Sequence, residues 1–249
     1  MSALARGLSV LRAFSPGNRP LGNAEIAERV NLAKPTVSRI TFTLTELGYL
    51  KLIEDSGKYQ LGPGVLSLGY DVMAQMEIRD VARPHMQELA DYADASIYLG
   101  APDGTDFIYL EACRTPASMT IRLGVGSRVP MPMTGMGRAY LAALSDDEYQ
   151  KYMLLFAERF GDQWPLIKKN MEQAIAQARI SGFAITIGEW IPEANSAGAV
   201  IKHPDGRPIY AVNIGGLQSI ITKERLENDL GPRILGVARH IELIARGLF

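Results

Sequence analysis

The stretch AEIAERVNLAKPTVSRITFTLTELGYL, residues 24–50, decides the fold of the first part of the chain. Its apolar residues recur at helical spacing before Asn31 and again after Lys34. Pro35 stands in the first turn of the second segment, where its missing N–H breaks no hydrogen bond. Gly48 marks the end of that segment. The stretch therefore predicts two helices joined by a short turn.

The flanking residues extend this pattern on both sides. Residues 3–14 place leucines at helical spacing, and Asn23 is the expected N-cap of the helix that follows. Strand-like runs at 49–53 and 58–61 predict a hairpin. Helix, helix, turn, helix and hairpin is the order of a winged helix-turn-helix, whose third helix enters the major groove of DNA. We expect this domain to span residues 1–62.

The outward face of the third predicted helix carries groups that can read bases. Arg39 can give two hydrogen bonds to a guanine or reach a phosphate. Thr41 is expected on the same face, and the short hydroxyl side chains of Thr36, Ser38 and Thr43 allow close approach to the groove floor. Basic residues nearby suit phosphate contacts that set the register. The candidate DNA-binding residues are Arg6, Lys34, Thr36, Ser38, Arg39, Thr43 and Lys58. The alternative is a solvated polar face on an ordinary three-helix unit.

The composition fits a folded protein whose parts differ in charge. Of 249 residues, 47% are hydrophobic and 21% charged, which excludes a histone-like protein and a disordered acidic tail. Residues 1–64 hold eight basic and five acidic groups, whereas the remainder holds 18 and 22. A basic segment on a mildly acidic body suggests a head that binds a polyanion.

Other features narrow the class of protein. No apolar run approaches the roughly 18 residues of a membrane span, and the first residues lack a secretory signal, so we expect a cytoplasmic protein with no membrane partner. The single Cys113 excludes an internal disulfide framework and a cysteine-cluster zinc site. The three histidines lie far apart in the sequence, so we expect neither a metal nor a cofactor.

A joint at Gly62-Pro63-Gly64 is followed by a strongly apolar stretch that predicts a helix up to about residue 79. Such a face must be covered. The same helix of a second subunit would cover it and give a dimer with two DNA-binding domains. The alternative is that the helix packs on the C-terminal part of its own chain. We therefore expect a linker and dimerisation helix at 63–80, followed by an effector-binding and oligomerisation domain at 81–249.

The remainder of the chain mixes helices and strands. Helices are expected at 81–93, 135–144, 146–159, 165–180 and, for the most part, 226–248. Strands are expected at 96–100, 107–112, 119–123, 183–187, 197–202 and 208–214. Strand runs with helices before and after them indicate an α+β domain, an antiparallel sheet covered by helices of the ligand-sensing type.

These residues resemble the IclR family of bacterial transcription regulators from about Ala3 to Gly247. The motifs that carry the resemblance are LARGLSVLRAF (4–14), residues 24–50, YQLGPGVLSLG (59–69), IRLGVGSRVPMPMTGMGRAYLA (121–142), GFAITIGEW (182–190) and DGRPIYAVNIGG (205–216). The resemblance implies a homodimer or a dimer of dimers on a roughly palindromic double-stranded operator. It also implies a GAF-like C-terminal domain that binds a small, often acidic or aromatic metabolite. Family members both repress and activate.

The resemblance also implies an effector site. Family members that bind small oxo-acids use main-chain N–H groups that correspond to Gly135 and Met136, and a helix N-terminus suits a carboxylate on physical grounds as well. Their acidic residue and cysteine correspond to Thr186 and Ser196 here, and two serines correspond to Asn213 and Gly215. Loss of the acid and the added room predict a different, bulkier ligand.

Two further groups are candidates for that site. Methionines could form an adaptable apolar wall for an aromatic ring or simply pack in the core; they are Met119, Met131, Met133 and Met136. Arg128 could pair with a ligand carboxylate or make a structural ion pair.

The sequence thus predicts a ligand-responsive regulator, with repression favoured over activation, that has no catalytic residues. Two alternatives remain: a DNA-binding protein without an effector, and an enzyme fused to a DNA-binding head. Gly135-x-Gly137 lacks the rest of a dinucleotide fingerprint, and neither a P-loop nor a G-x-S-x-G elbow is present. Cys113 reads as a buried small hydrophobe rather than as a nucleophile.

Overall fold

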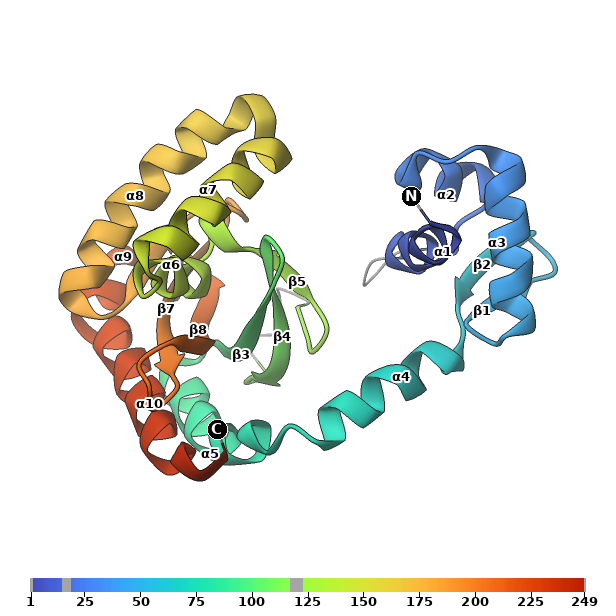
Figure 1. The fold of residues 1–249 in the computed structure, drawn as a ribbon. Helices are drawn as coiled ribbons and strands as arrows, with labels where there is room; N and C mark the ends of the chain where they lie inside the picture. Colours follow the sequence, from blue (N-terminus) through green and yellow to red (C-terminus); the bar gives the residue numbers. More distant parts are fainter. Residues whose placement is uncertain (1, 15–18, 117–122, 249) are drawn as a thin grey trace. The chain divides into compact units, whose positions relative to one another are not determined.

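The computed structural model describes residues 2–14, 19–116 and 123–248. The chain divides into two compact units, Met1–Met76 and Glu77–Phe249 (Figure 1). Each unit has its own hydrophobic core. In the described residues, no helix combines the length and the apolar character that crossing a membrane requires.

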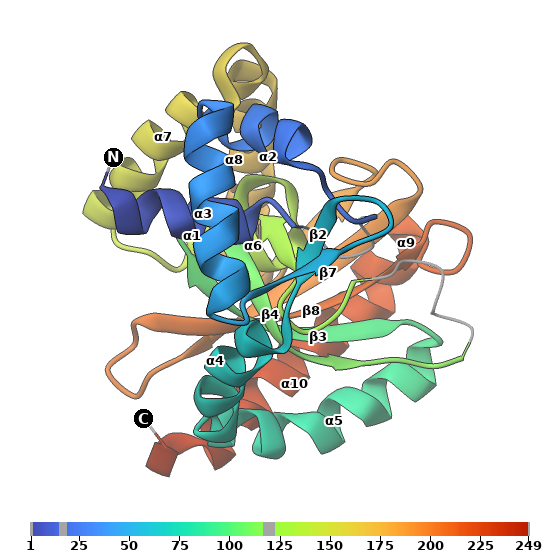
Figure 2. The same ribbon diagram turned by 90° about the vertical axis from the view of Figure 1, so that its right-hand side faces the viewer.

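The first unit is the predicted winged helix-turn-helix. Its elements are α1 (Ala3–Arg12), α2 (Asn23–Val30), α3 (Lys34–Glu46), β1 (Leu50–Ile53), β2 (Lys58–Leu61) and α4 (Pro63–Ala74). Val10, Leu21, Ile26 and Val37 are fully buried where the three helices meet. Figure 2 shows the hairpin of β1 and β2 beside α3. Leu21 and Tyr59 exchange two main-chain hydrogen bonds of 2.9 and 2.8 Å, which fasten the hairpin to the segment before α2.

The turn between α2 and α3 forms as the sequence predicts, but the N-cap prediction is wrong. Asn31 adopts the left-handed conformation, with φ 50° and ψ 51°, that lets the chain turn after α2. The cap residue is Gly22, whose N–H donates to Glu25 Oε2 at 2.9 Å. Asn23 is the first residue of α2, and its side chain contacts α3 instead.

The apolar stretch after Gly62 forms two helices rather than one that reaches residue 79. Helix α4 ends at Ala74, and α5 (Glu77–Ala93) begins three residues later and contains Pro84. No residue of α4 is buried, although the helix is strongly apolar. Its exposed apolar side chains include Leu66, Leu68, Tyr70 and Val72.

The second unit contains a six-stranded antiparallel sheet in the order β5-β4-β3-β8-β7-β6. The strands are β3 (Ser96–Asp103), β4 (Asp106–Cys113), β5 (Arg128–Pro130), β6 (Ala184–Ile187), β7 (Ala194–Lys202) and β8 (Pro208–Leu217). The expected strand at 119–123 lies almost entirely outside the described residues, and the short β5 was not predicted. Pairing aligns Thr186, Ser196, Gly215 and Ser96 in one row across four strands.

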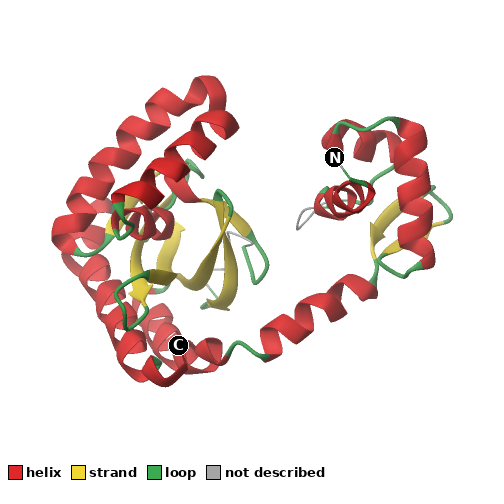
Figure 3. Ribbon diagram, in the orientation of Figure 1, coloured by secondary structure: helices red, strands yellow, loops and turns green. Residues whose placement is uncertain are grey.

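Helices cover this sheet, so the predicted α+β class is correct (Figure 3). Besides α5, the helices of this unit are α6 (Gly135–Ala142), α7 (Asp146–Phe160), α8 (Trp164–Ser181), α9 (Lys223–Arg225) and α10 (Gly231–Ile244). Helix α6 packs on β7 and β8, and α8 packs on α6 and β6. Helix α5 contacts β3 and β4, and α10 contacts β7 and β8. Short 3₁₀ helices lie at Met131–Met133, Gly161–Gln163 and Arg246–Leu248, and a π-helical segment at Leu226–Leu230 precedes α10.

The start of α6 lies directly on the backbone of β7. A Cβ atom at Gly198 would stand 2.2 Å from the Met136 nitrogen, and one at Gly135 would stand 2.7 Å from the Gly198 nitrogen. Only glycine permits so close an approach of two backbones. This approach fixes the helix N-terminus against the sheet.

Candidate functional site

Helix α3 presents an exposed face opposite its buried side. Val37 and Thr41 are fully buried and define the inner side of the helix. Arg39 lies on the opposite side together with Phe42, whose side chain is 66% exposed. The sequence prediction missed Phe42, and it wrongly placed Thr41 on the outer face.

The polar side chains of α3 differ in how many of their hydrogen-bonding groups are already used within the protein. Ser38 Oγ accepts a hydrogen bond from Asn23 Nδ2 at 3.1 Å, and Thr43 Oγ1 donates to the main-chain oxygen of Arg39 at 3.0 Å. Thr41 donates to Asn23 Oδ1, also at 3.1 Å. The exposed guanidinium of Arg39 makes no hydrogen bond or ion pair within the described part of the chain, so all of its donors remain available.

The remaining candidates for DNA contact surround this face. Lys34 is exposed at the start of α3, and Thr36 is half-buried. Arg6 on α1 lines the same apolar groove as Thr36, Arg39 and Thr43. On the hairpin, Lys58 pairs with Glu25 at 3.4 Å, so its charge is partly neutralised.

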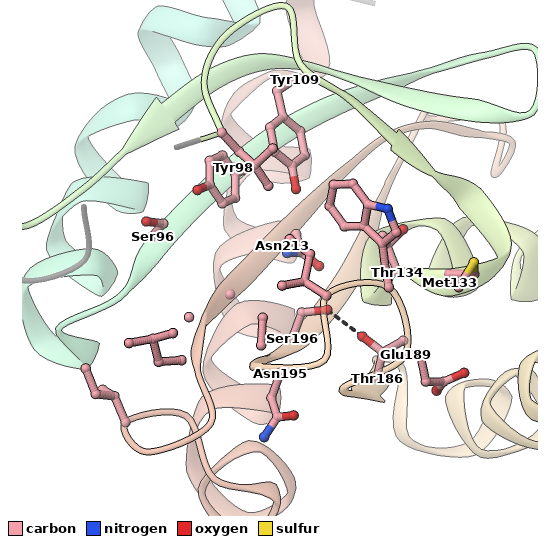
Figure 4. Close-up of a pocket in the computed structure, with 18 of the residues that line it drawn as sticks. Ser96, Tyr98, Tyr109, Met133, Thr134, Thr186, Glu189, Asn195, Ser196 and Asn213 are labelled. Carbon is pink, nitrogen blue, oxygen red and sulfur yellow. Dashed lines mark hydrogen bonds between the residues drawn. The ribbon is translucent and has the colours of Figure 1, made fainter. Parts of the chain in front are cut away.

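The second unit encloses a cavity between the sheet, the start of α6 and the loop after β6 (Figure 4). It is partly open to solvent, and the empty space of about 700 Å³ there includes solvent at its mouth, so the enclosed part is much smaller. Seven of the eight residues assigned to an effector site from the sequence line this cavity or hydrogen-bond to its lining. Met133, Thr186, Ser196, Asn213 and Gly215 line it, and the N–H groups of Gly135 and Met136 donate to lining side chains.

The floor of the cavity is polar. Thr186 and Ser196 share a hydrogen bond of 2.7 Å between their hydroxyl oxygens, drawn as the dashed line in Figure 4. The same row continues across Gly215 to Ser96. A Cβ atom at Gly215 would make only ordinary contacts, at 3.4 Å or more, so this glycine leaves usable space and relieves no clash.

The N-terminus of α6 is already satisfied by side chains of the sheet. The Gly135 N–H donates to Ser196 Oγ at 3.2 Å, and the Met136 N–H donates to Asn213 Oδ1 at 3.1 Å. An acid that binds here must displace these two oxygens or hydrogen-bond to the side chains that carry them. The main-chain donors expected from the sequence are therefore positioned at the cavity but occupied.

Aromatic rings form one wall. Tyr98 and Tyr109 stack with ring centroids 4.1 Å apart and planes 10° apart, and Trp190 lines the cavity near them. Complete burial raises the pKa of Tyr109 well above its usual value, so its phenol stays neutral. Met131 and Met136 belong to the buried core, which favours core packing as their role, and Met119 lies outside the described residues.

A buried ion pair supports the loop that borders the cavity. The Arg138 side chain is 1% exposed and donates from both terminal nitrogens to Glu189, with Nη1 2.6 Å from Oε1. Arg138 Nε also donates to the Pro132 carbonyl at 2.8 Å. Glu189 is also one of the residues that line the cavity. This pair could not be predicted from local patterns, because its members are 51 residues apart in the chain.

Arg128 lies outside the cavity. Its guanidinium pairs with Asp103 and, through Nε at 3.3 Å, with Asp106. Arg128 therefore makes the structural ion pair that was the alternative to a ligand contact, and its position does not support a contact with a ligand carboxylate. Among the described residues that line the cavity, Asp94 and Glu189 are acidic and none is a lysine, arginine or histidine.

The features that could indicate catalysis do not form a site. Burial raises the pKa of the Cys113 thiol to about 11, which leaves little thiolate at neutral pH. His85 and His240 meet edge to face, with ring centroids 4.3 Å apart. Within the described residues, no three histidine, cysteine or acidic side chains gather as metal ligands do.

Comparisons with known proteins agree with this architecture. Residues 3–52 match the model of the IclR helix-turn-helix domain, and residues 70–243 match that of the bacterial transcriptional regulator IclR C-terminal domain. The chain is 27% identical to the transcriptional regulator TsaQ1/TsaQ2 of Comamonas testosteroni, over 96% of this chain and 87% of that protein.

Solved structures include an IclR family transcriptional regulator from Brucella abortus, with 40% identity and a TM-score of 0.85, covering 98% of this chain and 92% of that one. An IclR homologue from Microbacterium hydrocarbonoxydans, solved with 4-hydroxybenzoate, shares the fold at 20% identity and a TM-score of 0.76, with 99% and 100% covered. The relatives are transcriptional regulators rather than enzymes. The two matched domains, and the winged helix and cavity that they contain, show that this chain belongs to the IclR family of bacterial transcriptional regulators.

Proposed function

We propose that this regulator binds a palindromic operator as a homodimer, or as a dimer of dimers, and that a small aromatic acid controls it. The observation that carries the proposal is the cavity of the second unit, which combines an aromatic wall with a polar floor at a helix N-terminus. A protein that only bound DNA would have no need of such a cavity. We infer a repressor, which leaves its operator when the acid binds.

The chemistry of the lining supports an aromatic acid. A flat ring fits beside the stacked pair Tyr98 and Tyr109. At the other end, a carboxylate can take over the N–H groups of Gly135 and Met136, where the partial positive charge of a helix N-terminus favours an anion. The homologue solved with 4-hydroxybenzoate supports the same class of ligand.

Helix α4 supports the homodimer. Its exposed side chains Leu66 and Tyr70, four residues apart, lie on one side of the helix, and an exposed apolar face of this kind is usually covered in an assembly. An isologous contact would bring the same face of two copies together and pair two recognition helices with two half-sites. Effector binding would then shift the population between spacings of the two heads.

A ligand screen on the full-length protein tests the proposal. Aromatic acids, short aliphatic acids and sugars are compared by the shift in melting temperature. A ligand at about a hundred times its dissociation constant adds roughly 2.7 kcal/mol, which should raise the melting temperature of a unit of this size by about 5–10 °C.

Matched controls make the outcome specific. Gly215→Leu should fill the cavity and remove the shift, whereas Gly236→Leu, at a position where a Cβ meets nothing within 4 Å, should retain it. A hit should also weaken binding to a selected DNA duplex. If aromatic acids give no shift, or if Gly215→Leu responds as the unchanged protein does, the proposed effector site is wrong.

A further inference from the structure

Phe42 occupies a distinctive place on the exposed face of α3. Its side chain is 66% exposed, and it follows Arg39 by three residues, so the two stand on neighbouring turns of the same face. Other exposed apolar residues of this unit, such as Leu4, Leu8 and Leu47, line the groove between α1 and α3. Phe42 does not line that groove, and it lies on the side of the helix opposite Val37.

The hydrogen bonds of α3 limit which of its side chains can read bases. Thr41 is buried, and the hydroxyl proton of Thr43 is donated to the main chain of its own helix. Ser38 Oγ already accepts a hydrogen bond from Asn23 Nδ2. Of the outward side chains near the middle of the helix, Arg39 keeps all its donors and Phe42 offers an apolar surface. The only strongly apolar group that B-DNA presents on its major-groove edges is the C5-methyl of thymine.

We propose that Phe42 is a specificity-determining residue that contacts the methyl group of a thymine in each operator half-site, an inference that rests on the proposed operator binding. The spacing on the helix predicts where this thymine lies. Side chains three residues apart are about 5–6 Å apart at Cβ, and successive base pairs rise by about 3.4 Å. The thymine should therefore stand one or two base pairs from the position that Arg39 contacts.

The test compares thymine with deoxyuridine, which lacks only that methyl group. The full-length protein first selects duplexes from a random library, and each thymine of the selected sequence is then replaced in turn. Affinity is measured by fluorescence anisotropy at one salt concentration, because salt changes all protein–DNA affinities. Burying one methyl group corresponds to about a fourfold effect. We expect that loss at one thymine per half-site, and about sixteenfold when both half-sites are changed.

Variants assign the effect to the side chain. Phe42→Ala should bind the thymine and deoxyuridine duplexes equally, and Phe42→Leu should keep part of the difference because it retains an apolar group. Leu47→Ala is the matched control: Leu47 is 62% exposed near the end of the same helix but lines the α1 groove, so the full fourfold ratio should remain. Circular dichroism and the melting temperature confirm that each variant is folded.

The inference is overturned if no single thymine gives more than a twofold ratio, or if Phe42→Ala keeps the ratio of the unchanged protein. Sequence-selective binding with no methyl dependence would leave operator binding intact and remove only the role of Phe42. Failure to enrich any sequence would remove both, because a residue that reads a base must produce selectivity.

Discussion

Removing one member of the buried pair Arg138–Glu189 should harm the second unit unequally, depending on which charge is left behind. Arg138 is 1% exposed, whereas the Glu189 side chain is 21% exposed and borders the cavity. Glu189→Gln leaves a guanidinium in the interior without its counter-ion, and breaking a buried pair in this way costs about 3–5 kcal/mol. Arg138→Met leaves a carboxylate that can turn to solvent, so we expect about 1–3 kcal/mol.

The double variant gives the decisive measurement. Once Arg138 is methionine, no buried positive charge remains, so adding Glu189→Gln should change little and the double variant should also lose about 1–3 kcal/mol. The coupling energy then equals the loss caused by Glu189→Gln alone, about 3–5 kcal/mol, which is at or above the upper end of the usual range for contacting residues. At about 2–4 °C per kcal/mol, Glu189→Gln alone should lower the melting temperature by about 6–20 °C.

Differential scanning calorimetry of the full-length protein measures these losses on the transition of the second unit. Glu172→Gln serves as the control, because Lys168 and Glu172 form a 3.7 Å pair with both side chains about half exposed, where the effect should stay below about 0.5 kcal/mol. The reasoning from burial is refuted if Arg138→Met is the more damaging single change, or if the double variant loses the sum of the two singles.

Three other outcomes can be measured on the same protein. Asn213→Ala removes the acceptor of the buried Met136 N–H and should destabilise the second unit by about 1–3 kcal/mol in urea unfolding. An acid that binds at the N-terminus of α6 should offset part of that loss, because its carboxylate accepts from the same N–H. Equal losses with and without the acid would show that the acid does not bind at this N–H. Arg39→Ala should weaken operator binding by about 1–3 kcal/mol and relax selectivity at one base pair, whereas a uniform loss over all sequences would mean a phosphate contact. Burial raises the pKa of Cys113 to about 11, so the thiol ionises at lower pH in the unfolded chain than in the folded one. The buried neutral thiol therefore contributes its full stabilisation below about pH 9, and this stabilisation is lost as the pH rises to about 11. Cys113→Ala should therefore show a shallower fall in stability across that interval, by about 2–3 kcal/mol, and an unchanged slope would contradict the raised pKa.

The winged helix could be predicted from the sequence because its signals are local. The helical spacing of apolar residues, Pro35 at the start of α3 and Gly48 after its end all act within a few residues of where they stand. The same local reasoning misplaced Asn23 and Thr41, because their positions depend on a hydrogen bond between α2 and α3. Thr41 stands four residues after Val37 and three before Leu44, so helical spacing places it on the buried side. Its polar hydroxyl suggested the surface instead, and the bond to Asn23 satisfies that hydroxyl in the interior.

The site in the second unit was predictable only where the family resemblance carried it. The resemblance led to Ser196, Asn213 and Gly215, which do line the cavity. It could not reveal that side chains already occupy the N–H groups of α6, since that depends on distances across the sheet. The pair of Arg138 and Glu189 is likewise a product of folding, because nothing in either local segment identifies the partner.

The exposed aromatic on α3 was missed for a different reason. The predicted DNA contacts of α3 are all made by hydrogen-bonding groups, whereas a phenylalanine in a helix usually belongs to the core. The burial of Val37 and Thr41 shows that Phe42 points away from the core. Helical spacing carries the same signal, because Phe42 lies about 120° around the helix from the buried stripe.

The contact of α6 with β7 also restricts the direction in which this helix can move. At Gly198 the two backbones already touch without a side chain between them, so no compressible layer remains on the sheet side. A molecule that enters the cavity can lift the helix away or slide it along the strand, but it cannot press the helix closer. A bound molecule can therefore displace α6 only away from the sheet or along it.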